Sequence, residues 1–283
     1  DLDKFALPSQ MLAAGGRVVF DERTGFGFGL SRTGEELVLS FREEGNLFRV
    51  VDEVRFEGQL PLRTEGRYPD GGAWFVAMKP TPGGGNSGPI ASVVLDEIMY
   101  RPVEVEGVPQ TSEFVELWNW TSKPVVLSGA QGGWRVGGGI EFVFPIGVSI
   151  PAGGRLVLVP FHPEDLVARD RFMAEHGLDE GEGIRLFGPY SGALSNGGER
   201  VALESPIASE DPSAPIAWVL QDEVIYFDAL PWPETADGMG ASLQRKSAAW
   251  SGNDPENWRA GEPSPGDWLG GLEPASATSL QLY

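Results

Sequence analysis

The sequence VVLDEIMYRPVEVEGVPQTSEFVELWNW spans Val93–Trp120 and decides the fold. It predicts two β-strands, Val93–Tyr100 and Glu113–Trp120, because both are rich in β-branched, aromatic and long apolar residues. Two prolines and a glycine mark the polar loop between them. The chain after this stretch has the pattern of the rest of one β-domain. The chain before it resembles the second half of another.

The composition favours many short strands joined by turns. The chain holds 39 glycines and 23 prolines among 283 residues, yet 41% of its residues are apolar. An apolar content of this size supports a packed core, and the abundance of turn residues disfavours long helices. We therefore expect an all-β protein.

Acidic residues outnumber basic ones by 41 to 21, which gives a net charge of −20. Such a surface repels phosphate backbones and anionic lipid, so nucleic acid is an improbable partner. We interpret the charge as a solubility feature, with binding of calcium or a cationic partner as the alternative.

The chain has no cysteine, which excludes disulfides, thiolate nucleophiles and cysteine-bound zinc. No apolar run reaches the roughly 20 residues of a membrane-spanning helix, and we expect no membrane insertion. The sequence begins with Asp1 rather than methionine, which suggests a piece of a longer protein whose export signal is not among these residues.

Turn-rich segments divide the chain into four parts. We predict a partial β-domain over 1–82, a linker over 83–90, a complete β-domain over 91–268 and a second linker over 269–283. In the partial domain the predicted strands are Arg17–Phe20, Phe26–Leu30, Glu36–Phe41 and Leu47–Phe56.

One short helix interrupts the strands of the second part, over 163–177. Pro163 suits its first turn, Glu164 and Asp165 suit the positive end of its dipole, and Gly177 ends it. His176 is then placed to complement the helix C-terminus.

Four blocks of the second part repeat blocks of the first in the same order. Gly15-Gly16-Arg17 matches Gly153-Gly154-Arg155, 138 residues on, and Gly34-Glu35 matches Gly198-Glu199, 164 residues on. The other two pairs are Asp52-Glu53-Val54 with Asp222-Glu223-Val224, and Pro80-Thr81-Pro82-Gly83 with Pro263-Ser264-Pro265-Gly266. The spacing only grows, as in a tandem repeat with loop insertions. The first copy has no counterpart of Val93–Ile140, so we interpret it as a truncated domain. A half-sandwich leaves apolar faces uncovered, so we expect residues 1–88 either to dock on the complete domain or to be poorly ordered.

The repeated blocks resemble the lamin-tail domain, a family of immunoglobulin-like β-sandwiches. The resemblance rests on an ordered set of short motifs: Leu95-Asp96-Glu97-Ile98-Met99-Tyr100, Glu113-Phe114-Val115-Glu116-Leu117-Trp118-Asn119, Leu127-Ser128-Gly129, Pro151-Ala152-Gly153-Gly154, Leu194-Ser195-Asn196-Gly197-Gly198-Glu199, Trp232-Pro233, Ala236-Asp237-Gly238, Ser242-Leu243-Gln244-Arg245 and Pro263-Ser264-Pro265-Gly266. It implies a sandwich of about 7 to 9 strands. It also implies a binding or structural role rather than catalysis.

No pair of residues predicts catalysis. Glu113 and Glu116 lie three apart in a strand, hence on opposite faces, and cannot converge as an acid/base pair. We expect Glu116 to be buried and to accept hydrogen bonds from backbone amides. The two histidines, His162 and His176, flank the predicted helix about 20 Å apart and cannot share a metal. We therefore expect neither an enzyme, nor a metal site, nor a cofactor.

Three tryptophans, Trp118, Trp120 and Trp134, are the candidate ligand-binding residues. Aromatic side chains on a sandwich can stack on sugar rings or receive a partner strand. The competing interpretation is that they fill the core and the ends of the sandwich. Asn119-Trp120-Thr121 matches a glycosylation acceptor, but its place in a strand suggests that it is unused.

The sequence thus predicts a non-catalytic binding or spacer module of a larger, exported bacterial protein, located outside the cell or at its surface. The alternative is an accessory domain of a surface hydrolase that presents polysaccharide, or less plausibly nucleic acid, to an enzyme encoded elsewhere. Its partner would be a protein or a polysaccharide, and its oligomeric state is not predicted.

Overall fold

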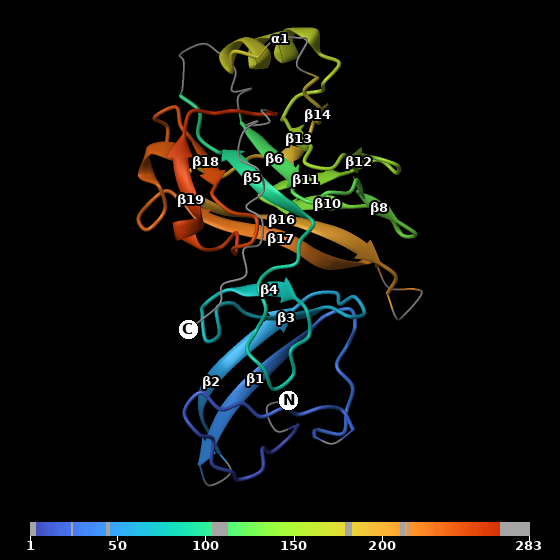
Figure 1. Cartoon of the computed structure of the whole chain (residues 1–283), viewed down its shortest axis with the longest axis vertical. Helices are drawn as coiled ribbons and strands as arrows, with labels where there is room; N and C mark the ends of the chain where they lie inside the picture. Colours follow the sequence, from blue (N-terminus) through green and yellow to red (C-terminus); the bar gives the residue numbers. More distant parts are fainter. Residues whose placement is uncertain are drawn as a thin grey trace.

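The computed structural model describes residues 4–23, 25–43, 46–103, 113–178, 183–209, 213 and 215–266. Within them the chain is all-β with a single α-helix, α1 (Leu166–Glu175), as predicted (Figure 1). The 269–283 linker lies outside the described residues. The strands are β1 (Glu35–Glu43), β2 (Asn46–Phe56), β3 (Thr64–Arg67), β4 (Phe75–Met78), β5 (Val93–Met99), β6 (Phe114–Asn119), β7 (Val125–Val126), β8 (Ser128–Gly129), β9 (Gly132–Gly133), β10 (Arg135–Gly138), β11 (Ile140–Val143), β12 (Ser149–Ile150), β13 (Arg155–Leu158), β14 (Leu186–Phe187), β15 (Ser191–Gly192), β16 (Gly198–Ile207), β17 (Ala217–Phe227), β18 (Ser242–Arg245) and β19 (Trp258–Gly261).

Two sheets form a β-sandwich from β5 onward. One has the order β14-β13-β6-β5-β18-β19 and the other β15-β11-β10-β16-β17. The β13–β14 pair is parallel and the other pairs in these two sheets are antiparallel. The short strands β14 and β15 extend the edges, which brings the sheets to more strands than the lamin-tail resemblance implies.

The hairpin β5–β6 lies at the centre of the six-stranded sheet, and both of its faces are buried. Its inner face supplies Val93, Leu95, Ile98, Val115 and Leu117 to the main core, each of them fully buried. Leu95 and Ile98 share a face although they are three residues apart. The register shift between Leu95 and Glu97 explains this, because a β-bulge inserts one extra residue.

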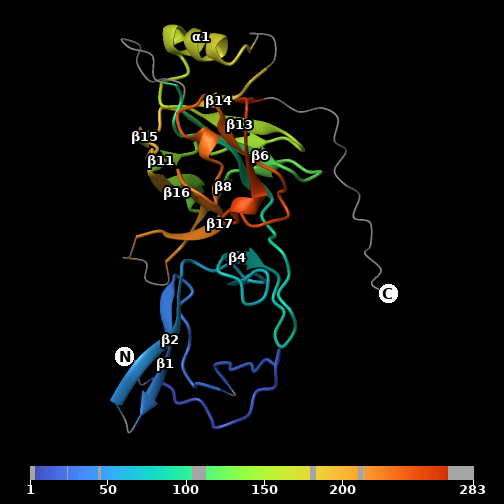
Figure 2. The same cartoon turned by 90° about the vertical axis from the view of Figure 1, so that its left-hand side faces the viewer.

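The two hairpins that precede β5 form separate two-stranded sheets, β1–β2 and β3–β4. Figure 2 shows them beyond β17, at the end of the molecule opposite α1. The predicted strands Glu36–Phe41 and Leu47–Phe56 are confirmed as parts of β1 and β2. Among the described residues of 1–90 there is no closed sandwich.

The predictions of strands at Arg17–Phe20 and Phe26–Leu30 are wrong, because neither segment has strand structure. The reason is the lack of a partner. In the later part of the chain β13 is held between β6 and β14, whereas no strand pairs with 17–20 in the described structure. Apolar patterning alone does not make a strand without a neighbour.

The N-terminal hairpins dock against β16 and β17, one of the two expected outcomes. The amide of Gly58 donates to the carbonyl of Trp218 at 2.8 Å, and Arg63 Nη1 donates to Gln221 Oε1 at 2.8 Å. Arg32 also donates to the carbonyl of residue 208 at 2.8 Å. Residues 4–90 are thus attached to one edge of the sandwich rather than covering its face.

The helix is shorter than predicted. Asp165 is its N-cap and not a first-turn residue, since its carboxylate accepts from the amides of Val167 and Ala168 at 3.1 and 3.2 Å. Gly177 ends the helix as predicted, with φ of 63° directly after the C-cap residue His176.

Candidate functional site

Trp118 is mostly a packing residue. It lies against a small cluster of Ala91, Val94 and Ala248, and the guanidinium of Arg155 lies 5.0 Å from its ring centroid. Its indole Nε1 is buried and has no hydrogen-bond partner within the described structure. This orphaned donor is a polar atom that a ligand could engage only after the surrounding residues moved.

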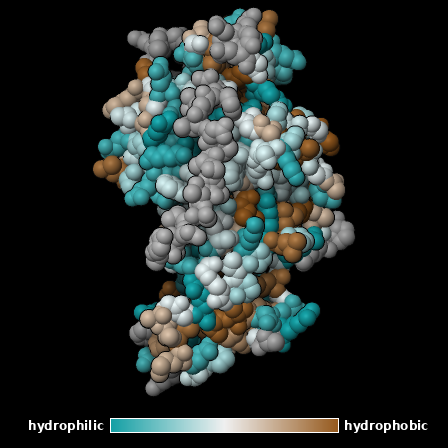
Figure 3. All heavy atoms as spheres, in the orientation of Figure 1, coloured by the Kyte–Doolittle hydropathy of each residue, from teal (hydrophilic) through white to brown (hydrophobic). Residues whose placement is uncertain are grey.

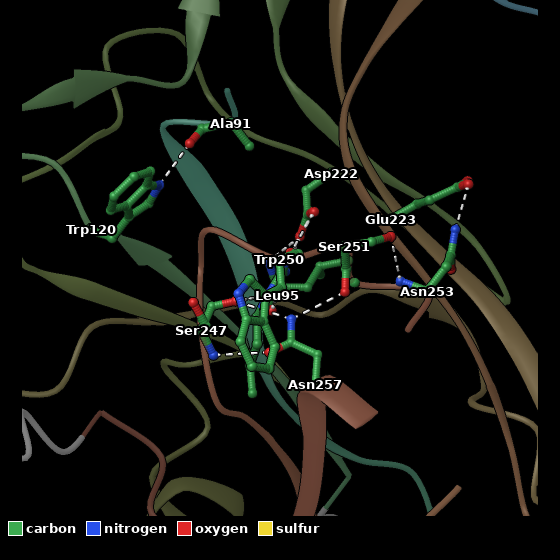
Figure 4. Close-up of polar contacts among 12 residues, drawn as sticks. Ala91, Leu95, Trp120, Asp222, Glu223, Ser247, Trp250, Ser251, Asn253 and Asn257 are labelled. Carbon is green, nitrogen blue, oxygen red and sulfur yellow. Dashed lines mark hydrogen bonds and ion pairs between the residues drawn. The ribbon is translucent and has the colours of Figure 1, made fainter. Parts of the chain in front are cut away.

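Trp120 is the most accessible of the three predicted binding residues, at 36% exposure. Its Nε1 donates to the carbonyl of Ala91 at 2.6 Å, which ties the ring to the segment before β5 (Figure 4). A ring held in one orientation loses little entropy when a ligand stacks on it. Trp120 is therefore suited to stacking.

Trp134 belongs to the other sheet and is partly buried against the main core. Its backbone amide donates to Leu127, and its carbonyl accepts from Phe144, both at 2.9 Å. No ring contact joins Trp118, Trp120 and Trp134 in the part of the chain described. The three do not form one aromatic platform.

Trp250 is an exposed tryptophan that the sequence interpretation did not select. It is 49% exposed, more than Trp120, and lies in the loop between β18 and β19. Its carbonyl accepts from Arg245 Nη2 at 2.7 Å, which holds the loop in place. The available signal was the sequence AAWSG, residues 248–252, a turn-like setting in which a core tryptophan is uncommon.

The carboxylate of Glu97 accepts hydrogen bonds from several segments of the chain. It accepts hydrogen bonds from the hydroxyl of Ser242, from the amide and hydroxyl of Ser264 at 2.9 and 3.0 Å, and from Gln244 at 3.4 Å. Burial raises its pKa, and these hydrogen bonds oppose the rise. The bonds attach the Pro-Ser-Pro-Gly loop, 263–266, to the outer face of β5.

Glu116 is buried and accepts a hydrogen bond from a backbone amide, as predicted. One oxygen accepts from the amide of Gly266 and the other from Arg155 Nε at 2.8 Å. Arg155 Nη2 also donates to Asp96 at 2.8 Å. Burial and the neighbouring Asp96 raise the pKa of Glu116 well above its ordinary value, and Arg155 opposes them. This group of charges fastens β13 and the 263–266 loop to β5 and β6.

Glu113 does not meet Glu116, as expected from their spacing. It accepts instead from the hydroxyl of Tyr190 at 3.3 Å and the amide of Leu194 at 3.4 Å. Burial raises its pKa. The two carboxylates serve different parts of the fold and cannot act together on a substrate.

A second network surrounds the bulge of β5 (Figure 4). Asp222 accepts from the amide of Leu95 at 2.9 Å and forms a buried ion pair with Arg245. Arg245 donates in addition to the carbonyls of Leu95, at 3.1 Å, and Ser247, at 3.1 Å. Both charges are fully engaged, so this network is structural.

His176 lies at the helix C-terminus as predicted, where it is the C-cap residue, but it does not complement the helix dipole with a positive charge. Its ring packs against Phe172 and Phe114, with centroids 4.6 and 5.4 Å away. Burial lowers its pKa to about 4, so the ring is neutral at neutral pH. His162 lies before the helix, and the predicted separation of the two histidines by α1 is confirmed.

Asn119 cannot accept a glycan in the folded chain, as predicted. It is completely buried, and its Nδ2 donates to the carbonyls of Lys123, Ile150 and Pro151 at 2.8 to 2.9 Å. The amide instead holds the loop after β6 to the strand β12.

A shallow groove of about 270 Å³ runs beside the Gly153-Gly154 turn. Arg155, Arg185 and Gly266 are among the residues that line it. Arg185 donates to the carbonyl of Ser149 at 2.6 Å and Arg155 forms an ion pair with Asp96, so both guanidinium groups have hydrogen-bond partners within the protein.

Within the described ranges, no group of three histidine, aspartate or glutamate side chains is arranged to hold a metal ion. In the same part of the chain, α1 is too short and polar to cross a membrane, and no other helix there qualifies.

No family model matches the sequence, and no curated protein matches it. A crystal structure of a DUF4876 family protein from Bacteroides thetaiotaomicron is similar over 83% of this chain and 90% of that one, with 10% identity and a TM-score of 0.38.

Proposed function

We propose that the chain is a non-catalytic binding or spacer module of a larger, exported bacterial protein. The observation that carries the proposal is the use of its buried carboxylates. Glu97, Glu116 and Asp222 each hold backbone amides of distant segments, and each is paired or surrounded by donors. An acid or base for catalysis needs access to a substrate proton, and these groups have none.

The proposal includes a tandem relation between the two parts of the chain. Support comes from turns that the sequence pairs: Gly15 and Gly153 have φ of 70° and 68°, and Gly83 and Gly266 have φ of 75° and 80°. An immunoglobulin-like module of the lamin-tail type, repeated along a chain, suits a spacer at the cell surface.

An accessory substrate-binding role is the second candidate. The partly exposed rings of Trp120 and Trp250 favour it, because carbohydrate rings stack on such indoles and the Trp120 ring is already held by the carbonyl of Ala91. The net charge of −20 makes polysaccharide a better ligand class than nucleic acid.

Two measurements test the proposal. A panel of glycosides, esters, peptides and nucleic acids incubated with the full chain should show no turnover. A hydrolysis that disappears in Glu116→Gln while the melting temperature is unchanged would overturn the non-catalytic assignment.

A glycan array then separates the two candidates. Specific binding that is lost in Trp120→Ala, or in Trp118→Ala with an unchanged melting temperature, but kept in the exposed control Ile146→Ala supports the accessory role. Trp134→Ala and Trp250→Ala map the surface further. No binding by the parent chain supports the spacer role.

A further inference from the structure

The hairpins β1–β2 and β16–β17 have the same register and the same irregularity. Leu39 pairs with Asp52 directly before a bulge in β2, and Leu203 pairs with Asp222 directly before a bulge in β17. The sequence repeat matches these same residues to each other. A shared bulge at one position places the side chains of both hairpins on corresponding faces.

Each hairpin also carries the same ion pair. Asp222 pairs with Arg245 of β18, whose partner across the strand is Trp258. Correspondingly, Asp52 pairs with Arg67 of β3 at 2.7 Å, and the partner of Arg67 across the strand is Phe75. Hence the hairpin β3–β4 is linked to β1–β2 in the same way as β18–β19 is linked to β16–β17.

The β-sandwich from β5 onward shows which strand pairs with this arrangement. There β5 pairs with the free side of β18, and the Asp222–Arg245 pair binds both the amide and the carbonyl of Leu95. In the described structure no strand lies on the corresponding side of β3. One backbone acceptor there, the carbonyl of Arg67, is bound by the side chain of Asn86 at 2.8 Å instead.

The apolar face of β1–β2 is only partly covered. Leu203 is fully buried, whereas Leu39, its counterpart, is 44% exposed. Val201, Val224 and Tyr226 are likewise fully buried, while their counterparts, Leu37, Val54 and Phe56, are only partly buried. Figure 3 shows hydrophobic surface over this N-terminal part of the molecule.

The polar groups around this partly covered face are complementary to carboxylates. In the complete part, Arg155 binds Asp96 and Glu116, while Ser264 and Gly266 bind Glu97 and Glu116. Their counterparts are Arg17, Thr81 and Gly83. Arg17 instead pairs with Asp70 at 2.7 Å, with both side chains about 40% exposed.

We propose that residues 4–83 form an acceptor site for an added β-hairpin with the chemistry of β5–β6. One strand of the hairpin pairs with the free edge of β3, and its backbone is held by Asp52 and Arg67. Its apolar residues cover Leu39 and its neighbours. Its carboxylates bind Arg17 and the Thr81–Gly83 loop. This is strand addition of the kind used by proteins that present an open sheet edge. It goes beyond the proposed function, because a non-catalytic module needs no such partner.

The test uses the full chain and a synthetic peptide of residues 91–121 as the probe hairpin. Calorimetry measures binding, and hydrogen exchange with mass spectrometry locates it. We expect slower exchange over 64–67 and 17–20, with exchange over 242–245 unchanged. Peptides carrying Glu97→Gln together with Glu116→Gln should bind at least about tenfold more weakly, because charge-assisted hydrogen bonds are lost. These peptide variants leave the protein itself intact.

Protein variants supply the matched control. Arg67→Ala should weaken binding about tenfold or more. Arg55→Ala should change it by less than about twofold, because Arg55 lies on β2 in an exposed surface pair with Glu57. The proposal is overturned if saturating peptide leaves exchange over 64–67 unchanged, or if both arginine variants act alike. It is also overturned if sedimentation shows that the chain alone forms dimers in which these segments are already protected, since the occupant is then a second copy.

Discussion

The repeated ion pair allows one interaction to be measured in two environments within the same chain. Asp222 and Arg245 have side chains that are 8% and 1% exposed, while Asp52 and Arg67 are 55% and 27% exposed. We predict that Asp222→Ala destabilises the sandwich strongly and that Asp52→Ala hardly changes stability.

The magnitudes follow from burial. Asp222→Ala leaves the guanidinium of Arg245 buried without a counter-charge and removes the acceptor of the Leu95 amide. Breaking a buried pair in this way costs about 3 to 5 kcal/mol. An exposed pair contributes about 0 to 1 kcal/mol, so Asp52→Ala should fall in that range. For a sandwich of this size the Asp222 variant should lower the melting temperature by about 6 to 20 °C.

Urea unfolding and thermal melts followed by circular dichroism measure both variants against the parent chain. Asp222→Asn is the intermediate case, because it retains an oxygen for the Leu95 amide but loses the charge. Equal losses for Asp222→Ala and Asp52→Ala would refute the reasoning, as would a loss below about 1 kcal/mol for Asp222→Ala.

Three further predictions concern single residues. Because burial holds the pKa of Glu116 well above 4.5, the folded chain binds this proton more tightly than the unfolded chain. The contribution of Glu116 to stability should therefore rise as the pH falls from neutral toward 4.5, and urea titrations of the parent chain should show this added contribution relative to Glu116→Gln. Burial lowers the pKa of His176 to about 4, so its contribution to stability is lost as the pH falls from 6.5 toward 4; a ring that titrates near 6.5 by NMR would contradict this. A Cβ on Gly133 would overlap the carbonyl oxygen of Phe144, so Gly133→Ala should cost about 3 kcal/mol or more in thermal melts, whereas Gly129→Ala meets open space and should be nearly neutral.

Local pairing explains which elements were predictable from sequence. The strands β1 and β2 pair antiparallel and are separated by only two residues in the sequence, so local alternation suffices to identify them. The helix end at Gly177 and the burial of Glu116 follow in the same way from short-range signals. The segment 17–20 has a similar pattern and forms no strand, because its pairing depends on a partner far away in the chain.

The candidate site was less predictable because exposure depends on tertiary neighbours. Trp118 and Trp120 are two residues apart in one strand region, yet one is packed under Arg155 and the other is half exposed. The order of apolar and polar residues in Val93–Tyr100 also does not reveal the bulge at Asp96. The bulge nevertheless directs two successive acidic side chains to the outer face, where Asp96 binds Arg155 of β13 and Glu97 binds Ser264 of the 263–266 loop.

The comparison of Leu39 with Leu203 shows what the hairpin β5–β6 contributes. Both leucines occupy the position before a bulge, opposite an aspartate that pairs with an arginine. Their exposure differs, 44% against none. Residue type, register and local charge are the same, so the difference comes from the strands that the first part does not show, β10 beside β16 and the hairpin β5–β6 of the facing sheet. The apolar content of a hairpin such as β1–β2 is therefore not sufficient to bury its own core positions, which depend on strands distant in the sequence.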